Sequence, residues 1–372
     1  MGDVEGRPVW LARNGLQQLV DALREGGRRV LGPVLRDGAV AFDEIRVLSD
    51  LPVGWRDEQQ PGSYRLRDEG DERVFGVVHG PGSIKPFVFA PRESLLQIES
   101  DGPGRPFRAS ATVPEPEPVA LLGVRPCDLA GLAAQDRVFL HDRYPDPYYA
   151  SRRSGLLLVA VNCTRSVSTC FCTSFDSGPE ARSGYDLALT ELDDGFLVHA
   201  GSPAGSALLE AVAHGPASDA VLADERSALD ACAKGIGRRL ETGDLPDLLY
   251  ENLSHPRFDD VAERCLACGN CTQVCPTCFC HDERDEPMLD GDGAIRVREW
   301  DTCFDRAHSQ VHGLNFRPHI RDRYRQWLVH KLGTWIDQFG SSGCVGCGRC
   351  LTWCPVGIDL TEEIAAIREE PS

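Results

Sequence analysis

Two runs of cysteine near the C-terminal end of this 372-residue chain constrain its fold more than any other feature. Both runs have the spacing Cys-x-x-Cys-x-x-Cys-x-x-x-Cys-Pro, in which three cysteines crowd into one short loop and a fourth stands just before a proline. This is the bacterial ferredoxin pattern, where three thiolates bind one [4Fe–4S] cluster and the fourth binds the other cluster. The repeat therefore predicts two clusters, whose ligands the pattern assigns as follows: Cys265, Cys268, Cys271 and Cys354 for the first, and Cys344, Cys347, Cys350 and Cys275 for the second.

Structural zinc sites are the alternative for the same cysteines. Zinc modules pair one Cys-x-x-Cys with a distant Cys or His pair, and they need no third and fourth cysteine at these spacings, still less twice. The distribution of all 16 cysteines also argues against a disulfide scaffold, since residues 1–250 hold five and residues 251–372 hold eleven. In a reducing compartment, such bunched cysteines indicate metal ligands.

The order of apolar runs and turns predicts two domains in an α+β chain. Residues 1–250 are expected to form an α/β domain, and residues 251–372 a two-[4Fe–4S] ferredoxin-like domain with a helical insert at about 276–343. In the insert we expect an acidic loop near 281–293, followed by mostly helical structure over 304–339. For the first domain, hydrophobic periodicity predicts a hairpin over 186–199, helices over 11–25 and 204–241, and strands over 28–35, 38–48, 73–78, 86–90, 119–124 and 155–161.

Four cysteines of the first domain form a candidate third iron–sulfur site. Cys127 and Cys163 each follow an unbroken apolar strand, and Cys170 and Cys172 come a few residues later. Ligand crevices of open α/β sheets lie outside the carboxyl ends of the strands, so the four thiols are expected to converge there. A helix N-terminus beside Cys127 is expected to lower its pKa. The alternatives are a redox-active thiol site without metal and simple burial.

The remaining cysteines lie outside these three groups. Cys232 stands alone in a helical stretch and is predicted to be a packed apolar side chain. Cys278, Cys280 and Cys303 lie in the insert, either as iron ligands or as packed thiols near the first cluster, and packing is the favoured interpretation.

Charge and hydropathy exclude several classes of function. With 39 Lys and Arg against 57 Asp and Glu, the net charge of −18 disfavours binding to nucleic acid or to an anionic membrane. No apolar run approaches the ~20 residues of a membrane span, and the N-terminal segment lacks the pattern of a signal peptide, so a cytoplasmic protein is expected. No G-x-G-x-x-G motif predicts a dinucleotide site. Only Lys85, Lys234 and Lys331 are lysines, and the abundant arginine suits fixed ion pairs better than lysine catalysis.

Several longer segments carry a resemblance to a known family. They are PVGWRDEQQPGSYRL, LLGVRPCDLAGLAAQDRVFL, VAVNCTRSVSTCFC, RCLACGNCTQVCPTCFC, WDTC, NFR…RYRQW…HK and CVGCGRCLTWCPVGIDL, which together span about residues 40–365. The chain resembles the β subunit of the cytosolic sulfhydrogenase-type [NiFe] hydrogenases, and also the electron-transfer subunit of anaerobic sulfite reductase, which is similar to it. The resemblance implies the same eight ferredoxin ligands in an electron-transfer subunit.

The resemblance also implies partners: the [NiFe] large subunit of the same complex, a flavin- and NAD(P)-binding subunit, and a small iron–sulfur subunit. The favoured hypothesis is therefore a relay subunit of an NAD(P)-linked hydrogenase, with no catalytic centre of its own. The alternatives are the corresponding subunit of a sulfite reductase, and a subunit that reduces sulfur or polysulfide at the upstream cysteines. Ferredoxin or sulfur species would then be external partners.

Overall fold

An eight-stranded mixed sheet organises the first half of the chain in the computed structural model, which describes residues 7–100, 106–141, 143–289 and 293–369. The strand order is β12-β1-β11-β10-β9-β8-β2-β3. The strands are β1 (Val9–Ala12), β2 (Arg29–Arg36), β3 (Ala39–Glu44), β8 (Val119–Val124), β9 (Leu156–Val161), β10 (Leu187–Leu192), β11 (Gly195–Ala200) and β12 (Gly215–Pro216).

The four central strands, β2, β8, β9 and β10, run parallel, and helices cover both faces of the sheet. Helices α1 (Gly15–Glu25) and α4 (Pro203–Glu210) pack on one face, where Leu19 meets Leu122 and Val159 in one buried cluster. Helices α2 (Pro126–Phe139) and α3 (Pro147–Gly155) pack on the other. Helix α5 (Asp219–Gly235) contacts β10 and β11. Strands β8 and β9 are unbroken apolar runs because both of their sides are covered.

The prediction of strands over 73–78 and 86–90 is wrong. Residues 74–78 are buried, but side chains rather than a neighbouring strand bind their backbone groups: the Glu191 carboxylate accepts from the N–H groups of Val74 and Phe75, and Asp57 accepts from Val78. The second segment contains a 3₁₀ turn, Lys85–Phe87. An apolar run cannot reveal that its hydrogen-bond partners are distant carboxylates.

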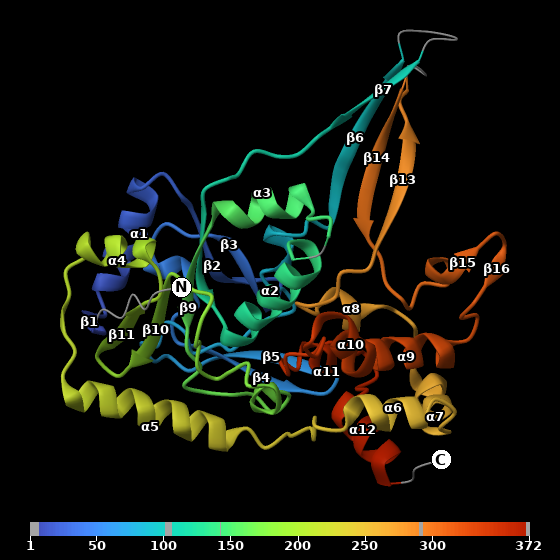
Figure 1. The fold of residues 1–372 in the computed structure, drawn as a ribbon. Helices are drawn as coiled ribbons and strands as arrows, with labels where there is room; N and C mark the ends of the chain where they lie inside the picture. Colours follow the sequence, from blue (N-terminus) through green and yellow to red (C-terminus); the bar gives the residue numbers. More distant parts are fainter. Residues whose placement is uncertain (1–6, 101–105, 142, 290–292, 370–372) are drawn as a thin grey trace.

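A second sheet joins the insert to the first half of the chain and projects from the body as an arm (Figure 1). Its order is β13-β14-β6-β7, from strands β6 (Arg92–Ser100), β7 (Phe107–Ala111), β13 (His281–Pro287) and β14 (Gly293–Trp300). Strand β13 occupies most of the stretch predicted as an acidic loop. Its charges pair across the ribbon, as Arg296 with Asp285 and Arg284 with Glu299, so a highly charged segment remains a strand in water.

The rest of the chain is mostly helical and encloses the ferredoxin cysteines. Residues 304–319 form a 3₁₀ turn and a small hairpin rather than the predicted helix, while the helical prediction is confirmed from Ile320 onward. A π-helical turn, His330–Thr334, joins α9 to α10. The elements are α6 (Leu245–Glu251), α7 (Arg257–Arg264), α8 (Asn270–Gln273), α9 (Ile320–Val329), α10 (Trp335–Phe339), α11 (Arg349–Thr352) and α12 (Leu360–Glu369), with hairpins β4 (Trp55–Gln60)–β5 (Ser63–Asp68) and β15 (Gln310–Val311)–β16 (Leu314–Asn315). Within the described ranges, no helix is long and apolar enough to cross a membrane.

A buried ion pair fastens the arm to the body. Arg298 of β14 lies opposite Glu93 of β6, with 2.6 Å between a guanidinium nitrogen and the carboxylate, and also pairs with Asp146. The Arg298 and Glu93 side chains are only 5% and 4% exposed. Removing one partner of such a pair leaves a desolvated charge without compensation.

We predict that Arg298→Leu lowers the free energy of unfolding by about 3 kcal/mol, at the low end for a broken buried pair because Arg152 still binds Glu93. The matched control is Arg296→Leu, whose exposed pair with Asp285 should contribute less than about 1 kcal/mol. Denaturant unfolding under anoxic conditions measures both. Equal losses in the two variants would contradict the role assigned to the buried pair.

Candidate functional site

The two cysteine runs fold into two copies of one local structure. In each, the third cysteine lies in a four-residue helix, α8 or α11, and the residue before that helix is a glycine in the left-handed region, Gly269 or Gly348, both with φ 76°. A side chain on Gly348 would place its Cβ 2.1 Å from the carbonyl oxygen of Thr169, so only glycine allows this approach. Helices α8 and α11 also contact each other. The repeated spacing thus has a repeated fold.

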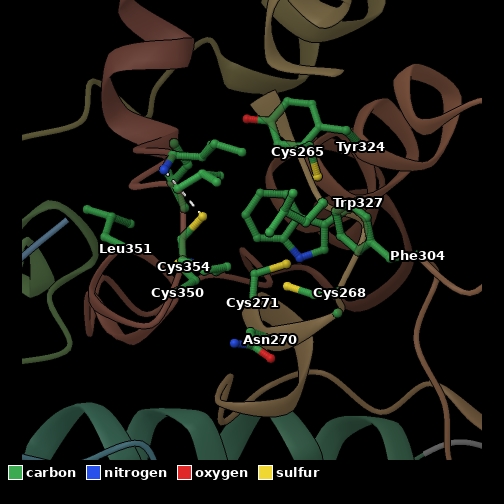
Figure 2. A pocket seen from close by; sticks show the side chains of 16 residues that line it. Cys265, Cys268, Asn270, Cys271, Phe304, Tyr324, Trp327, Cys350, Leu351 and Cys354 are labelled. Carbon is green, nitrogen blue, oxygen red and sulfur yellow. Dashed lines mark hydrogen bonds between the residues drawn. The ribbon is translucent and has the colours of Figure 1, made fainter. Parts of the chain in front are cut away.

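The cysteines predicted for the first cluster line one apolar pocket (Figure 2). Aromatic side chains of Phe304, Tyr324 and Trp327 form its other wall. Backbone N–H groups point at two of the sulfurs, from Ala267 to Cys265 at 3.4 Å and from Ile358 to Cys354 at 3.3 Å. Such N–H groups stabilise a reduced, more negative cluster. The four cysteines that the structure brings together here are Cys265, Cys268, Cys271 and Cys354.

The cysteines predicted for the second cluster are also brought together, deeper in the protein. Burial first, and the neighbouring sulfurs next, raise the pKa of Cys350 and Cys347, and that of Cys344 to about 12. Cys275 is among those neighbours for all three, although it is 69 or more residues away in sequence. The N–H of Gly346 donates to the Cys344 sulfur at 3.4 Å. The fourth cysteine of each run therefore approaches the opposite run.

Structural zinc and an iron–sulfur cluster need different ligand arrangements. All sulfur ligands of a zinc ion lie about 2.3 Å from one point, whereas a cubane spreads its ligands over four irons. The preference for iron–sulfur clusters over zinc rests on the spacing of the two cysteine runs.

The four upstream cysteines converge at the carboxyl ends of β8 and β9. They line one pocket together with Cys232 and with Cys347 of the second run. The loop that carries them packs directly on the second run, because the N–H of Phe171 donates to the carbonyl of Gly346 at 2.9 Å. The upstream members of this pocket are Cys127, Cys163, Cys170 and Cys172.

Burial raises the pKa of all four upstream thiols, that of Cys172 to about 12. The expectation of a lowered pKa for Cys127 is therefore wrong, because burial and then the neighbouring Asp128 carboxylate raise this pKa. Buried neutral thiols become thiolates only beside a strong cation, so occupation of the pocket by iron would release protons.

A buried histidine at this pocket has one ring nitrogen that forms no hydrogen bond with any described residue. His79 lines the pocket, its Nε2 lies 2.8 Å from the Cys347 carbonyl oxygen, and its Nδ1 is buried without a hydrogen bond to the described part of the chain. Burial lowers the pKa of His79 to about 3, so its ring is neutral. Such a nitrogen beside four thiols fits a pocket that takes a further group.

Sequence reasoning missed the charged groups that lie among these cysteines. Lys331 is buried, and its ammonium group donates to the Cys275 sulfur at 3.2 Å and the Gly343 carbonyl at 3.1 Å. Burial opposes its charge, but the surrounding sulfurs, Cys275 first, raise the pKa of Lys331 well above the usual value. The sequence did offer one signal of this role: one of only three lysines in the chain lies between the two cysteine runs.

A second buried charge lies between the upstream pocket and the second run. Arg349 pairs with Asp128 at 2.8 Å, and their side chains are 0% and 1% exposed. Both charges act on Cys347 and on Cys127, which places a fixed ion pair between two groups of sulfurs. Its partners come from distant parts of the chain, so the sequence offers no sign of the pair.

Comparisons with known proteins agree with this geometry. Residues 264–358 match the family described as a 4Fe-4S dicluster domain. Over 372 residues, the chain is 30% identical to sulfhydrogenase 2 subunit beta of Pyrococcus furiosus, covering 98% of this chain and 99% of that protein. The chain belongs to the sulfhydrogenase beta-subunit family. No solved structure matches it.

Family membership and the matched domain establish the general character of this sulfhydrogenase beta-type subunit. It is an iron–sulfur electron-transfer protein whose C-terminal dicluster domain carries two [4Fe–4S] clusters. The mixed helices and strands of an α+β chain, with that domain at the C-terminal end, agree with the predicted fold class.

We predict that Lys331→Met lowers the midpoint potential of one of the two clusters by on the order of 100 mV, because a buried positive charge no longer stabilises the added electron. Lys234→Met, at an exposed lysine on α5, is the control and should change neither potential. Redox titration followed by electron paramagnetic resonance measures the potentials, with iron content confirming intact clusters. Unchanged potentials in a fully loaded Lys331 variant would exclude this role.

Proposed function

We propose that this chain is the iron–sulfur relay of a multisubunit, NAD(P)-linked [NiFe] hydrogenase. The observation that carries the proposal is the convergence of two ferredoxin cysteine runs with a third group of thiols, on a chain of the sulfhydrogenase beta-subunit family. When bound, the clusters accept and release one electron at a time. The protein holds them, excludes water and sets the charge around them.

The proposed ligands follow from which side chains share a pocket. Cys350 lines the pocket of the first four cysteines as well as neighbouring the second group, so the two clusters would lie close together. Backbone N–H groups, Lys331 and the Arg349–Asp128 pair would adjust the potentials. The first cluster takes Cys265, Cys268, Cys271 and Cys354, and the second takes Cys344, Cys347, Cys350 and Cys275.

A third cluster is proposed in the upstream pocket, on Cys127, Cys163, Cys170 and Cys172. Cys347 borders both this pocket and the second group, which supports a linear order of upstream site, second cluster and first cluster. Electrons would cross the chain in that order or its reverse. The chain itself would need no catalytic centre.

The first cluster lies at an edge suited to a partner subunit. Cys268 is exposed, and beside it Leu266 and Val356 have 63% and 37% of their surface in contact with water. Exposed apolar side chains next to a cluster are typical of a docking edge that shortens the path of an electron between proteins. The proposed partners are the [NiFe] large subunit, a flavin- and NAD(P)-binding subunit, and a small iron–sulfur subunit.

For the upstream site, we predict that the Cys127→Ser, Cys163→Ser double variant loses about four of about twelve iron atoms per chain. Cys232→Ser, which changes the fifth upstream cysteine of the same pocket, should retain all of them. Iron and acid-labile sulfide analysis after anoxic purification measures the change. Iron content that is the same in the double variant and the parent chain would remove the third cluster from the proposal.

For the complex, we predict that anoxic affinity purification of the chain from its native cell recovers a nickel-containing subunit together with a flavoprotein. Mass spectrometry and metal analysis identify both. Sirohaem without nickel would assign the chain to sulfite reduction instead. Recovery of the chain alone with its clusters bound would contradict a relay role.

A further inference from the structure

Two cysteines outside the three groups, Cys280 and Cys303, lie side by side at the base of the arm. Cys280 directly precedes β13 and Cys303 follows β14 by three residues, so the pairing of these strands brings their ends together. The N–H of Asp301 donates to the Cys280 carbonyl at 2.9 Å, which closes the base of the hairpin. The two cysteine side chains hydrogen bond to each other, and both are partly exposed.

A histidine and an aspartate complete the group. His308 hydrogen bonds to the Cys280 sulfur and, through Nδ1, to the Asp301 carboxylate. Asp301 in turn accepts from the N–H of Thr302 at 2.7 Å, which fixes the carboxylate. The order carboxylate, imidazole, thiol is the arrangement in which a base activates a sulfur nucleophile and a third group orients the base.

The charges of the group favour a reactive thiolate. Hydrogen bonds from Cys303 and His308 lower the pKa of Cys280 to about 4, while Asp301 and Cys280 raise that of His308 to about 10. The same pairing, and burial, raise the pKa of Cys303, so it keeps its proton. At pH values between these two pKa values, Cys280 is a thiolate and His308 beside it is an imidazolium. Other charged or titratable groups that act on this pair include His330, Lys85, Lys331, Cys278 and Cys271.

Simple packing does not account for this group. Packed thiols are neutral and need no oriented imidazole. A thiolate beside a protonated thiol is the form in which a dithiol attacks a disulfide.

We propose that Cys280 and Cys303 form a redox-active dithiol that reduces low-molecular-weight disulfides, with His308, oriented by Asp301, as its proton donor and acceptor. The Cys280 thiolate attacks one sulfur of the disulfide RSSR′, the S–S bond breaks, and RS⁻ leaves with the proton of His308. Cys303 gives its proton to His308 and attacks the Cys280 sulfur, which releases R′S⁻. After protonation, RSH and R′SH are the products, and a Cys280–Cys303 disulfide remains.

The return of the pair to the dithiol consumes two electrons and two protons. A reduced iron–sulfur cluster, held by the cysteines proposed above, would supply these two electrons one at a time. Cys303 neighbours Cys271, a proposed ligand of the first cluster, so this recharging step rests on the proposed function. The pair would thereby connect one-electron transfer with two-electron thiol chemistry.

The first test follows the two thiols in the full chain, purified anoxically with its clusters. The chain is reduced with dithionite, desalted and mixed with hydroxyethyl disulfide, then alkylated, digested and examined by mass spectrometry. We expect at least one disulfide consumed per chain and, once the reducing equivalents of the clusters are spent, a linked pair of peptides that contain Cys280 and Cys303. In Cys303→Ser the linked pair should vanish, and hydroxyethyl thiol should remain attached to Cys280. Separate alkylation of both cysteines after exposure to the disulfide would overturn the proposal.

The second test addresses His308 with a matched control. His308→Asn should slow alkylation of Cys280 by iodoacetamide at pH 6 at least tenfold, because a thiol with an ordinary pKa near 8.5 is almost fully protonated there. His312→Asn, at an exposed histidine of the β15–β16 turn, should leave that rate unchanged. Equal rates in the two variants would remove His308 from the mechanism.

The two proposals fail in distinguishable ways. Iron content and cluster spectra of the same samples report on the relay, whereas the linked peptides report on the dithiol. Reduction by dithiothreitol in place of dithionite tests the exchange reaction without any cluster. Loss of the linked pair under both reductants overturns the dithiol even when every cluster is present.

Discussion

The close packing of one upstream loop on the second cysteine run is the constraint on which the rest of the structure depends. Residues 169–172 lie backbone against backbone with residues 346–348, because both contact positions of the second run are glycine. A Cβ at Gly346 would lie 2.4 Å from the carbonyl oxygen of Phe171. This contact sets the upstream pocket against Cys347 and so makes a continuous series of sulfur groups from three distant segments.

Charged side chains are buried beside the cysteines. A chain with a net charge of −18 holds Lys331 and the Arg349–Asp128 pair in its interior, beside sulfur groups that would become anionic when they bind iron. A cation buried near thiolates costs desolvation, and the sulfur charge offsets that cost. The same effect operates at the base of the arm, where the imidazolium of His308 and the thiolate of Cys280 stabilise each other's charge.

The arm shows how an insert can serve both halves of the chain. Strand β14 pairs with β13 from the insert and with β6 from the first half, and Arg298 anchors the ribbon in the body. The hairpin base brings Cys280 and Cys303 together, which are 23 residues apart in sequence. The first-half and ferredoxin-like parts predicted from the sequence are therefore joined by a shared sheet as well as by the chain itself.

Features that depend on interactions between residues close in sequence could be predicted from the amino-acid pattern alone. The cysteine spacing predicted the two repeated loops, and the unbroken apolar runs predicted β8 and β9, because both patterns reflect local geometry and burial. Which distant groups meet depends instead on how the whole chain folds. The partners of residues 74–78 are the carboxylates of Asp57 and Glu191, and β13 needs the arginines that pair across the ribbon. Burial in the folded chain raises the pKa of the upstream thiols and keeps them neutral. Only the tertiary structure could reveal the roles of Lys331, Arg349 and the Cys280 group. Their desolvation and pairing arise only when the folded chain excludes water around them.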